Sequence, residues 1–250
     1  MTGEEEEIVF GFNPALAILA DGTRPVESVH LLIGGRGGRF VEAETLARSR
    51  GLRPRLLERA ALDRLTGGGT HQGIAVRVGA RVQPTWDTLL ERLEERIDPL
   101  LLVLDGIEDP RNLGAILRCA EAFGVEAVIL PRDRSAPLSS VAVKASAGAA
   151  GRVDAVRVVN LARALTELRD RGVRVVGLAG DAPRHLDAGS LAGPLALVLG
   201  GEGKGLRRLT KERCDELLAI PMRGGVGSLN VAVAVGIALY ETRRGRDGQS

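Results

Sequence analysis

The chain has 250 residues, of which 44% are hydrophobic but only 2% aromatic, and its formal net charge is +2. A mean hydropathy of +0.06, with no apolar run near the roughly 18 residues of a membrane span, indicates a globular protein with an aliphatic core. The acidic start MTGEEEEIVF excludes the basic beginning of a secretory signal, so we expect a cytoplasmic protein.

Arginine is far more common than lysine, with 31 arginines and 3 lysines. Genome composition can produce this bias, but planar guanidinium groups also suit phosphate contacts, so it agrees with a nucleic-acid partner. Cys119 and Cys214 lie far apart in the chain and form neither a disulfide framework nor a metal-ligand motif. We therefore expect two reduced thiols and no metal site.

The first 80 residues have the pattern of a small α/β domain. Apolar periodicity and glycine stops predict helices and strands in alternation. The expected elements are a helix at 13–22 ended by Gly22, a strand at 26–35, a helix at 40–51 ended by Gly51, a strand at 53–58, a helix at 59–69 and a strand at 71–79.

Residues 81–99 are expected to form the linker between two domains. Apolar side chains recur there at helical spacing between Pro84 and Pro99. They are Trp86, Leu89, Leu90, Leu93 and Ile97.

From residue 100 to residue 246 the chain is expected to form a second, larger α/β domain. The run LLLVLDG is typical of a parallel strand covered on both faces, and the helix after it is expected to have Asn112 as N-cap and Gly124 as C-cap. Strands that alternate with helices predict a largely parallel sheet. The further expected strands are 125–131, 154–159, 173–180, 195–200 and 216–221, with helices at 138–149, 160–172 and 206–214.

Two glycine-rich loops follow the last two expected strands, LVLGGEGKGL at 197–206 and IPMRGGVGSLN at 220–230. The first loop fails the P-loop pattern, because Val198 occupies the position of the first glycine and Gly205 that of the magnesium-binding hydroxyl. It also fails the dinucleotide pattern, because Leu206 occupies the position of the third glycine. Both failures argue against a site for nucleotide phosphates.

Three segments in residues 105–241 resemble, in order, the three motifs of the SpoU (TrmH-like) family of RNA ribose 2′-O-methyltransferases. They read DGIEDPRNLGAILRCAEAFG, LVLGGEGKGL and IPMRGGVGSLNVAVAVGIALYE. The segments KASAGAAGRV and HQGIAV extend the resemblance to nearly the whole chain, and they indicate the subgroup that methylates a guanosine ribose in bacterial 23S ribosomal RNA.

This resemblance implies a fold, a cofactor and an assembly. The catalytic domain at 100–246 is expected to be a parallel-sheet α/β domain with a C-terminal trefoil knot, preceded by a small α/β RNA-binding domain at 1–80. S-adenosylmethionine is the expected cofactor, ribosomal RNA the expected partner, and a homodimer without membrane contact the expected assembly, in which each site borrows from its neighbour.

The family resemblance also implies which residues bind the cofactor. Because glycine lacks a Cβ, the glycines of the two loops are expected to admit the adenosyl group close to the backbone. The implied cofactor-binding residues are Leu199, Gly200, Gly201, Gly203, Ile220, Met222, Ser228, Leu229 and Asn230.

The implied catalytic residues are Asn112, Arg118, Glu202, Ser228 and Asn230. Arg118 matches the arginine that is thought to activate the ribose hydroxyl. Because a guanidinium keeps its proton, we favour a role in which Arg118 binds the target phosphate and promotes hydroxyl ionisation electrostatically. Asn112 would orient Arg118 or the substrate, and Glu202 would fix its loop or pair with Arg118 across the dimer.

Each of these residues also has an ordinary interpretation. Arg118 could face solvent on its helix, Glu202 could be solvated, and Ser228 and Asn230 could simply cap a helix. His71 and Gln72 match an N-terminal signature, and a histidine at the start of a strand is more often structural than catalytic.

Other observations keep alternative functions open. Gly227 and Ala232 depart from the serines that are common in the subgroup, which makes the choice of target less certain, and His30 and His185 have no partner evident in the sequence. The alternatives are a transfer-RNA ribose 2′-O-methyltransferase, a catalytically silent RNA-binding or ribosome-assembly protein, and a nucleotide-dependent α/β enzyme.

Overall fold

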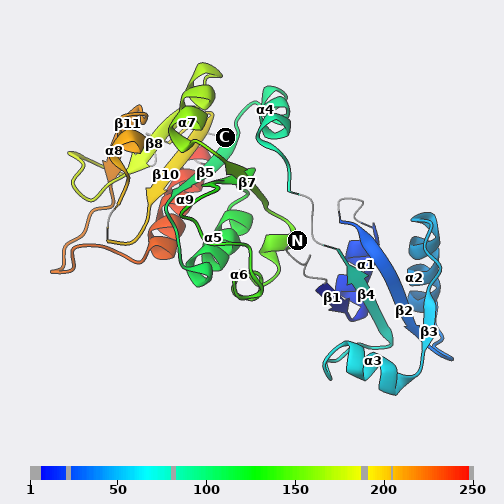
Figure 1. The fold of residues 1–250 in the computed structure, drawn as a ribbon. Helices are drawn as coiled ribbons and strands as arrows, with labels where there is room; N and C mark the ends of the chain where they lie inside the picture. Colours follow the sequence, from blue (N-terminus) through cyan, green and yellow to red (C-terminus); the bar gives the residue numbers. More distant parts are fainter. Residues whose placement is uncertain (1–6, 21–23, 80–82, 187–190, 204, 248–250) are drawn as a thin grey trace. The chain divides into compact units, whose positions relative to one another are not determined.

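The computed structural model divides into two compact units, Met1–Val82 and Gln83–Ser250 (Figure 1). It describes residues 7–20, 24–79, 83–186, 191–203 and 205–247. The expected helix stop at Gly22 lies outside these residues. Across the described ranges, no helix has the length and apolar character needed to cross a bilayer, and no cluster of acidic, histidine and cysteine side chains could hold a metal ion.

The first unit contains a four-stranded sheet with the order β1-β4-β2-β3, in which only β2 and β3 are parallel. Its elements are β1 (Glu7–Phe10), α1 (Phe12–Ala20), β2 (Val26–Leu32), α2 (Gly38–Ser49), β3 (Arg55–Leu57), α3 (Arg59–Leu65) and β4 (Ile74–Val78). The helices and strands predicted here are confirmed, with shifted ends. Strand β1 was not predicted, because a four-residue strand is stabilised by pairing with distant β4 rather than by a local pattern.

The HQG signature forms the turn that leads into β4. The buried His71 accepts a hydrogen bond from the Gly73 N–H at Nδ1 (2.9 Å), and its Nε2 lies 3.0 Å from Asp63 Oδ1. Gln72 Oε1 accepts from the Phe12 N–H (3.0 Å), although the Gln72 backbone has a φ of 55°. These contacts give both signature residues a structural role, since they tie β4 to α1 and α3.

The second unit contains a seven-stranded sheet with the order β7-β6-β5-β10-β8-β11-β9, and every pair is parallel. This sheet and the small α/β unit before it confirm the predicted parallel-sheet α/β domain and the small domain that precedes it. The strands are β5 (Leu100–Asp105), β6 (Ala127–Pro131), β7 (Asp154–Val158), β8 (Arg174–Leu178), β9 (Arg184–His185), β10 (Leu195–Gly200) and β11 (Glu216–Ala219). The two-residue β9 was not predicted.

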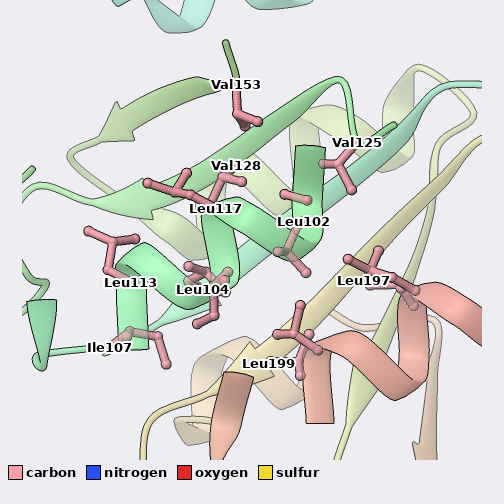
Figure 2. Packing of buried hydrophobic residues seen from close by; sticks show 14 of the residues in the cluster. Leu102, Leu104, Ile107, Leu113, Leu117, Val125, Val128, Val153, Leu197 and Leu199 are labelled. Carbon is pink, nitrogen blue, oxygen red and sulfur yellow. The ribbon is translucent and has the colours of Figure 1, made fainter. Parts of the chain in front are cut away.

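Side chains of β5 enter two different cores, because successive residues of a strand point to opposite faces of the sheet. Leu102 and Leu104 pack with Leu197 and Leu199 of β10 in the core that α5 and α9 cover (Figure 2). Leu101 enters the core on the opposite face. The helices of the first face are α5 (Pro110–Ala122), α6 (Ser140–Ala145) and α9 (Val231–Asp247); those of the second are α4 (Trp86–Glu94), α7 (Leu161–Asp170) and α8 (Arg208–Lys211).

Nine of the nineteen residues of the expected linker at 81–99 form α4, a helix of the second unit. The α4 side chains of Leu89, Leu90 and Leu93 are buried in the core beneath α7, and Trp86 Nε1 donates to Glu167 Oε2 on α7 (2.6 Å). Placing Ile97 on this helix was wrong: α4 ends at Glu94, and Ile97 is 94% exposed. These three leucines pack against a surface that exists only once the sheet has folded.

Helix α5 begins at Pro110, three residues earlier than an N-cap at Asn112 implies. Pro110 occupies its first turn, and the Asp109 carboxylate accepts the Arg111 N–H (2.8 Å), so Asp109 is the N-cap and the prediction of Asn112 as N-cap was wrong. The other end agrees with the prediction to within one residue. Gly124 follows the C-cap with a φ of 62°, in the left-handed region that glycine favours.

Candidate active site

The strand order brings three loops together at one edge of the large sheet. Parallel strands end at the same edge, and β5 and β10 are neighbours although 89 residues (106–194) separate them in the chain. The Gly201 N–H donates to the Asp105 carbonyl (2.9 Å), which joins the loop after β10 to the end of β5. The loop after β11 leads to the first turn of α9 at the same edge, and together these loops carry the three motifs.

One residue from each motif enters a single hydrogen-bonded cluster of Asn112, Glu202 and Asn230. Asn112 Nδ2 donates to Glu202 Oε1. Asn230 Nδ2 donates to Asn112 Oδ1 (3.0 Å) and lies 3.4 Å from Glu202 Oε1. The sequence analysis assigned all three to the site, and the structure shows that they also hold one another in place.

Asn230 also caps the start of α9. Its Oδ1 accepts the N–H groups of Ala232 (2.9 Å) and Val233 (3.3 Å), which is the N-cap arrangement considered for it. The cap fixes the side chain so that its Nδ2 points at Asn112 and Glu202. The capping and site interpretations of Asn230 are therefore not alternatives.

An ion pair between a buried carboxylate and a half-exposed arginine holds the same loops in place and was not foreseen. Asp105 ends the apolar β5 with a fully buried side chain, and its carboxylate accepts the Arg207 backbone N–H (2.9 Å) and the Arg207 guanidinium. A buried carboxylate requires such a partner, so this pair fixes where the loop after β10 returns to the sheet. A charged residue that ends an otherwise apolar strand was the available signal.

A cavity of about 500 Å³ lies between the ends of β8 and β10, the loop after β11 and α9; we name it the glycine cavity. Its size is within the range of small-molecule sites. Its lining includes every residue expected to bind the cofactor except Asn230, which precedes the lining residue Val231. Those lining residues are Leu199, Gly200, Gly201, Gly203, Ile220, Met222, Ser228 and Leu229.

A second, polar cavity of about 280 Å³ lies beside the first and contains Asn112 and Glu202. Asp105, Glu108, Asp109, Arg134 and Arg207 also line this polar cavity. The two cavities share a wall, because the same residues line both. These are Gly201, Glu202, Gly205 and Val231. Two ligands bound in them would meet at Glu202.

Two of the glycines in these loops are required for chain packing rather than for ligand access. A Cβ on Gly200 would lie 2.0 Å from the carbonyl carbon of Gly205, and a Cβ on Gly201 would lie 2.3 Å from the Gly106 oxygen. Both neighbours are backbone, so these glycines allow chain segments to pack against one another. Gly203 has a φ of 74° and open space around its Cβ position, so glycine is favoured there because the turn requires a left-handed backbone.

We predict that Gly200→Ala disrupts the site by destabilising the second unit. The added methyl group must displace backbone, and overpacking of this kind costs about 1–3 kcal/mol or more, equivalent to a fall in melting temperature of roughly 2–12 °C. Calorimetry of the variant measures this fall. Gly225→Ala is the matched control, because Gly225 has nothing within 4 Å of its Cβ position. Equal melting temperatures for the two variants would contradict the prediction.

The remaining expected catalytic residues lie outside the cluster. Ser228 lines the glycine cavity on an exposed loop. Arg118 is exposed on α5 and lines neither cavity. Six residues along a helix separate it from Asn112 by roughly 9 Å and roughly 120° around the axis. Within one chain, then, Arg118 and the Asn112 cluster face different directions.

The cysteines and histidines are not part of this arrangement. Burial raises the pKa of the Cys214 thiol to about 12, with a further contribution from the nearby carboxylates of Asp215 and Asp105. Burial also raises the pKa of the Cys119 thiol. Neither cysteine nor any histidine lines the glycine cavity or the polar cavity, so the side-chain functional groups available there are amides, carboxylates, arginines, the Lys211 ammonium and the Ser228 hydroxyl.

Fold and site together define an α/β enzyme whose ligands bind in loops at the carboxyl edge of a parallel sheet. The SpoU rRNA Methylase family matches residues 99–240, and the RNA 2′-O ribose methyltransferase substrate-binding family matches residues 8–82. The chain belongs to the SpoU rRNA methylase family. The trefoil knot that was expected with this family stays a prediction.

Similar proteins agree with this membership over almost the whole chain. A protein of Photorhabdus laumondii is 46% identical over 240 residues, covering 96% of this chain and 98% of its own length; the corresponding values for one of Escherichia coli are 43%, 96% and 99%. Both are named 23S rRNA (guanosine-2′-O-)-methyltransferase RlmB. The solved structure of the SpoU methyltransferase AviRb from Streptomyces viridochromogenes, in complex with the cofactor AdoMet, has the same fold, with a TM-score of 0.71, 24% identity and coverage of 97% and 91%.

Proposed function

We propose that this protein transfers a methyl group from S-adenosylmethionine to the ribose 2′-hydroxyl of a guanosine in 23S ribosomal RNA, and that it acts in the cytoplasm. The shared wall between the glycine cavity and the polar cavity is the observation that carries the proposal. One cavity has the size and backbone-rich lining suited to a small cofactor, and the other presents polar groups to a second ligand. Relatives of the same length and named activity favour ribosomal RNA over transfer RNA.

The glycine cavity is suited to S-adenosylmethionine. Leu199, Ile220 and Leu229 supply apolar surface for an adenosine, and the glycine backbones supply amide and carbonyl groups at close range. When bound, S-adenosylmethionine supplies a methyl group carried on a positively charged sulfonium. Asp181 and Lys211 line this cavity as an ion pair (3.2 Å), so Glu202 is the lining carboxylate that faces the region where a cationic ligand would lie.

Glu202 is the residue best placed to orient the ribose hydroxyl. Both amide contacts of the cluster involve Oε1, and among the described residues Oε2 has no hydrogen-bond partner. Oε2 is therefore available to accept the hydrogen of a 2′-hydroxyl at the wall between the two cavities. Asn112 and Asn230 hold the carboxylate in that orientation, which is the preorganisation that this type of catalysis requires.

The active protein is a homodimer that uses α9 as its interface. Val233, Ile237 and Tyr240 form an exposed apolar stripe at helical spacing, with 51%, 38% and 58% exposure. Ala122 lines the same groove as Tyr240 and lies one turn after Arg118 on α5. The face of α5 that carries Arg118 and Ala122 therefore borders the apolar stripe of α9. A two-fold dimer formed through this stripe would place Arg118 of the partner subunit at the interface, within reach of the polar cavity.

The assay for this function uses purified protein, S-adenosylmethionine labelled on its methyl group, and either ribosomal or transfer RNA. We expect label in 23S ribosomal RNA at a single guanosine, followed by an alkali-resistant linkage, because a methylated 2′-oxygen cannot attack the next phosphate. Label in transfer RNA alone would favour the tRNA alternative. Binding of RNA without any transfer would favour the silent RNA-binding protein.

A further inference from the structure

Arg134 stands out among the residues of the polar cavity, and neither the sequence motifs nor the cluster accounts for it. It lies in the loop that follows β6 and lines the same cavity as Asn112 and Glu202. Its backbone has a φ of 55°, a left-handed conformation that glycine or asparagine adopts more readily than arginine. An arginine at this position therefore needs a reason that local backbone preference does not supply.

Hydrogen bonds hold the loop that carries Arg134 to β7 and to the loop after β5. Ser135 Oγ accepts from Arg157 Nη1 (2.9 Å), and the Ala136 carbonyl accepts from Arg157 Nη2 (2.6 Å). The Ala136 N–H donates to the Ile107 carbonyl in the loop after β5 (2.7 Å). These bonds fix the loop to the first motif, so the backbone beside Arg134 is held in place at the edge of the polar cavity.

The charge of the cavity makes Arg134 important for an anionic ligand. Glu108, Asp109 and Glu202 line it and would repel a phosphodiester. Of the two arginines that line it, Arg207 is paired with the buried Asp105. Within the described part of the chain, Arg134 forms no ion pair, and its exposed guanidinium can bind a phosphate through two parallel hydrogen bonds.

We propose that Arg134 binds a phosphate of the RNA strand beside the methylated nucleotide and so positions the ribose against Glu202. This role rests on the proposed function and differs from that of Arg118, which has to come from the partner subunit. Arg134 belongs to the same chain as the Asn112 cluster. It therefore sets the distance between the bound RNA backbone and the hydroxyl that Glu202 orients.

The test compares Arg134→Ala, Arg134→Lys and Arg134→Gly with the wild-type dimer. The probe is a transcribed fragment of 23S ribosomal RNA that contains the methylated guanosine. We expect Arg134→Ala and Arg134→Gly to raise the KM for this RNA about tenfold or more, and to lower the slope of log affinity against log salt by about one. Arg134→Lys should recover part of the affinity, because it keeps the charge but loses the planar fork.

Two further measurements separate this role from a structural one. Arg134→Gly relieves the left-handed backbone, so its melting temperature should equal or exceed that of the wild type while its RNA affinity falls. The matched control is Arg171→Ala, which removes one exposed arginine at the end of α7, away from both cavities. Its RNA affinity should stay at the wild-type value.

The possible failures are distinguishable. If the wild type does not methylate the RNA fragment, the proposed function fails and Arg134 is not the cause. If the wild type methylates it and Arg134→Ala has the wild-type KM and salt dependence, the role of Arg134 is wrong and the proposed function stands. An equal loss of affinity in Arg171→Ala would show a general charge effect and would also overturn the role of Arg134.

Discussion

Mixing two inactive variants, Arg118→Ala and Asn230→Asp, is expected to restore about a quarter of the wild-type methyltransferase activity. Each variant alone should lose activity by a factor on the order of 100 or more, because one removes the arginine that binds the target phosphate and the other removes the amide donor that holds Glu202 in place. In a mixed dimer, one site combines an intact Asn230 with the intact Arg118 of the partner subunit. The other site carries both changes.

The amount of recovery follows from random assembly. Equal amounts of the two variants give mixed dimers as about half of the population, and one of their two sites is intact. Methyl transfer to 23S ribosomal RNA after unfolding and co-refolding of the variants measures the recovery, and each refolded variant alone is the control. If Arg118 served its own chain, no mixed dimer would contain an intact site and the mixture would stay inactive.

Asn230→Asp by itself is expected to abolish most activity without destabilising the protein. An aspartate keeps the oxygen that caps α9, and aspartate and asparagine are about equally good N-caps, so the melting temperature should change by less than about 2 °C. The change removes the donor to Asn112 Oδ1 and Glu202 Oε1 and places a carboxylate beside Glu202. A fall in kcat on the order of 100-fold is expected.

Asn160→Asp is the matched control for this variant. Asn160 caps α7 by accepting the Arg163 N–H (3.0 Å), so the chemical change at the cap is the same, but Asn160 lies outside both cavities. Its activity should equal that of the wild type. A loss of activity in Asn160→Asp equal to that in Asn230→Asp would contradict this explanation.

Much of the fold could be predicted because its signals are local. The apolar run of β5, the helical spacing of the α4 leucines and the glycine after α5 each reflect the periodicity or backbone preference of a few neighbouring residues. The short strands β1 and β9 have no such signal, because their stability comes from pairing with distant strands. Asp109 was missed as N-cap because Asn112, three residues later, fitted the same preference.

The candidate site divides in a similar way. The motif residues Asn112, Glu202 and Asn230 could be selected from the sequence by family resemblance, and the structure joins them by hydrogen bonds. The same resemblance offered a role for Arg118 across the dimer as one option, and within one chain Arg118 faces away from the cluster. Asp105 begins the first motif, but its pairing with Arg207 and the place of Arg134 in the polar cavity could be found only from the folded chain.

By itself, then, the sequence determined the alternation of strands and helices, the two-sided burial of the large sheet and the residue types available for chemistry. These depend on interactions between residues that are close in the chain. The tertiary structure decided that β10 lies beside β5, that Gly200 and Gly201 admit backbone, and that an arginine after β6 faces the polar cavity. Each of these depends on which distant segments become neighbours, and the packing of the whole sheet fixes that choice.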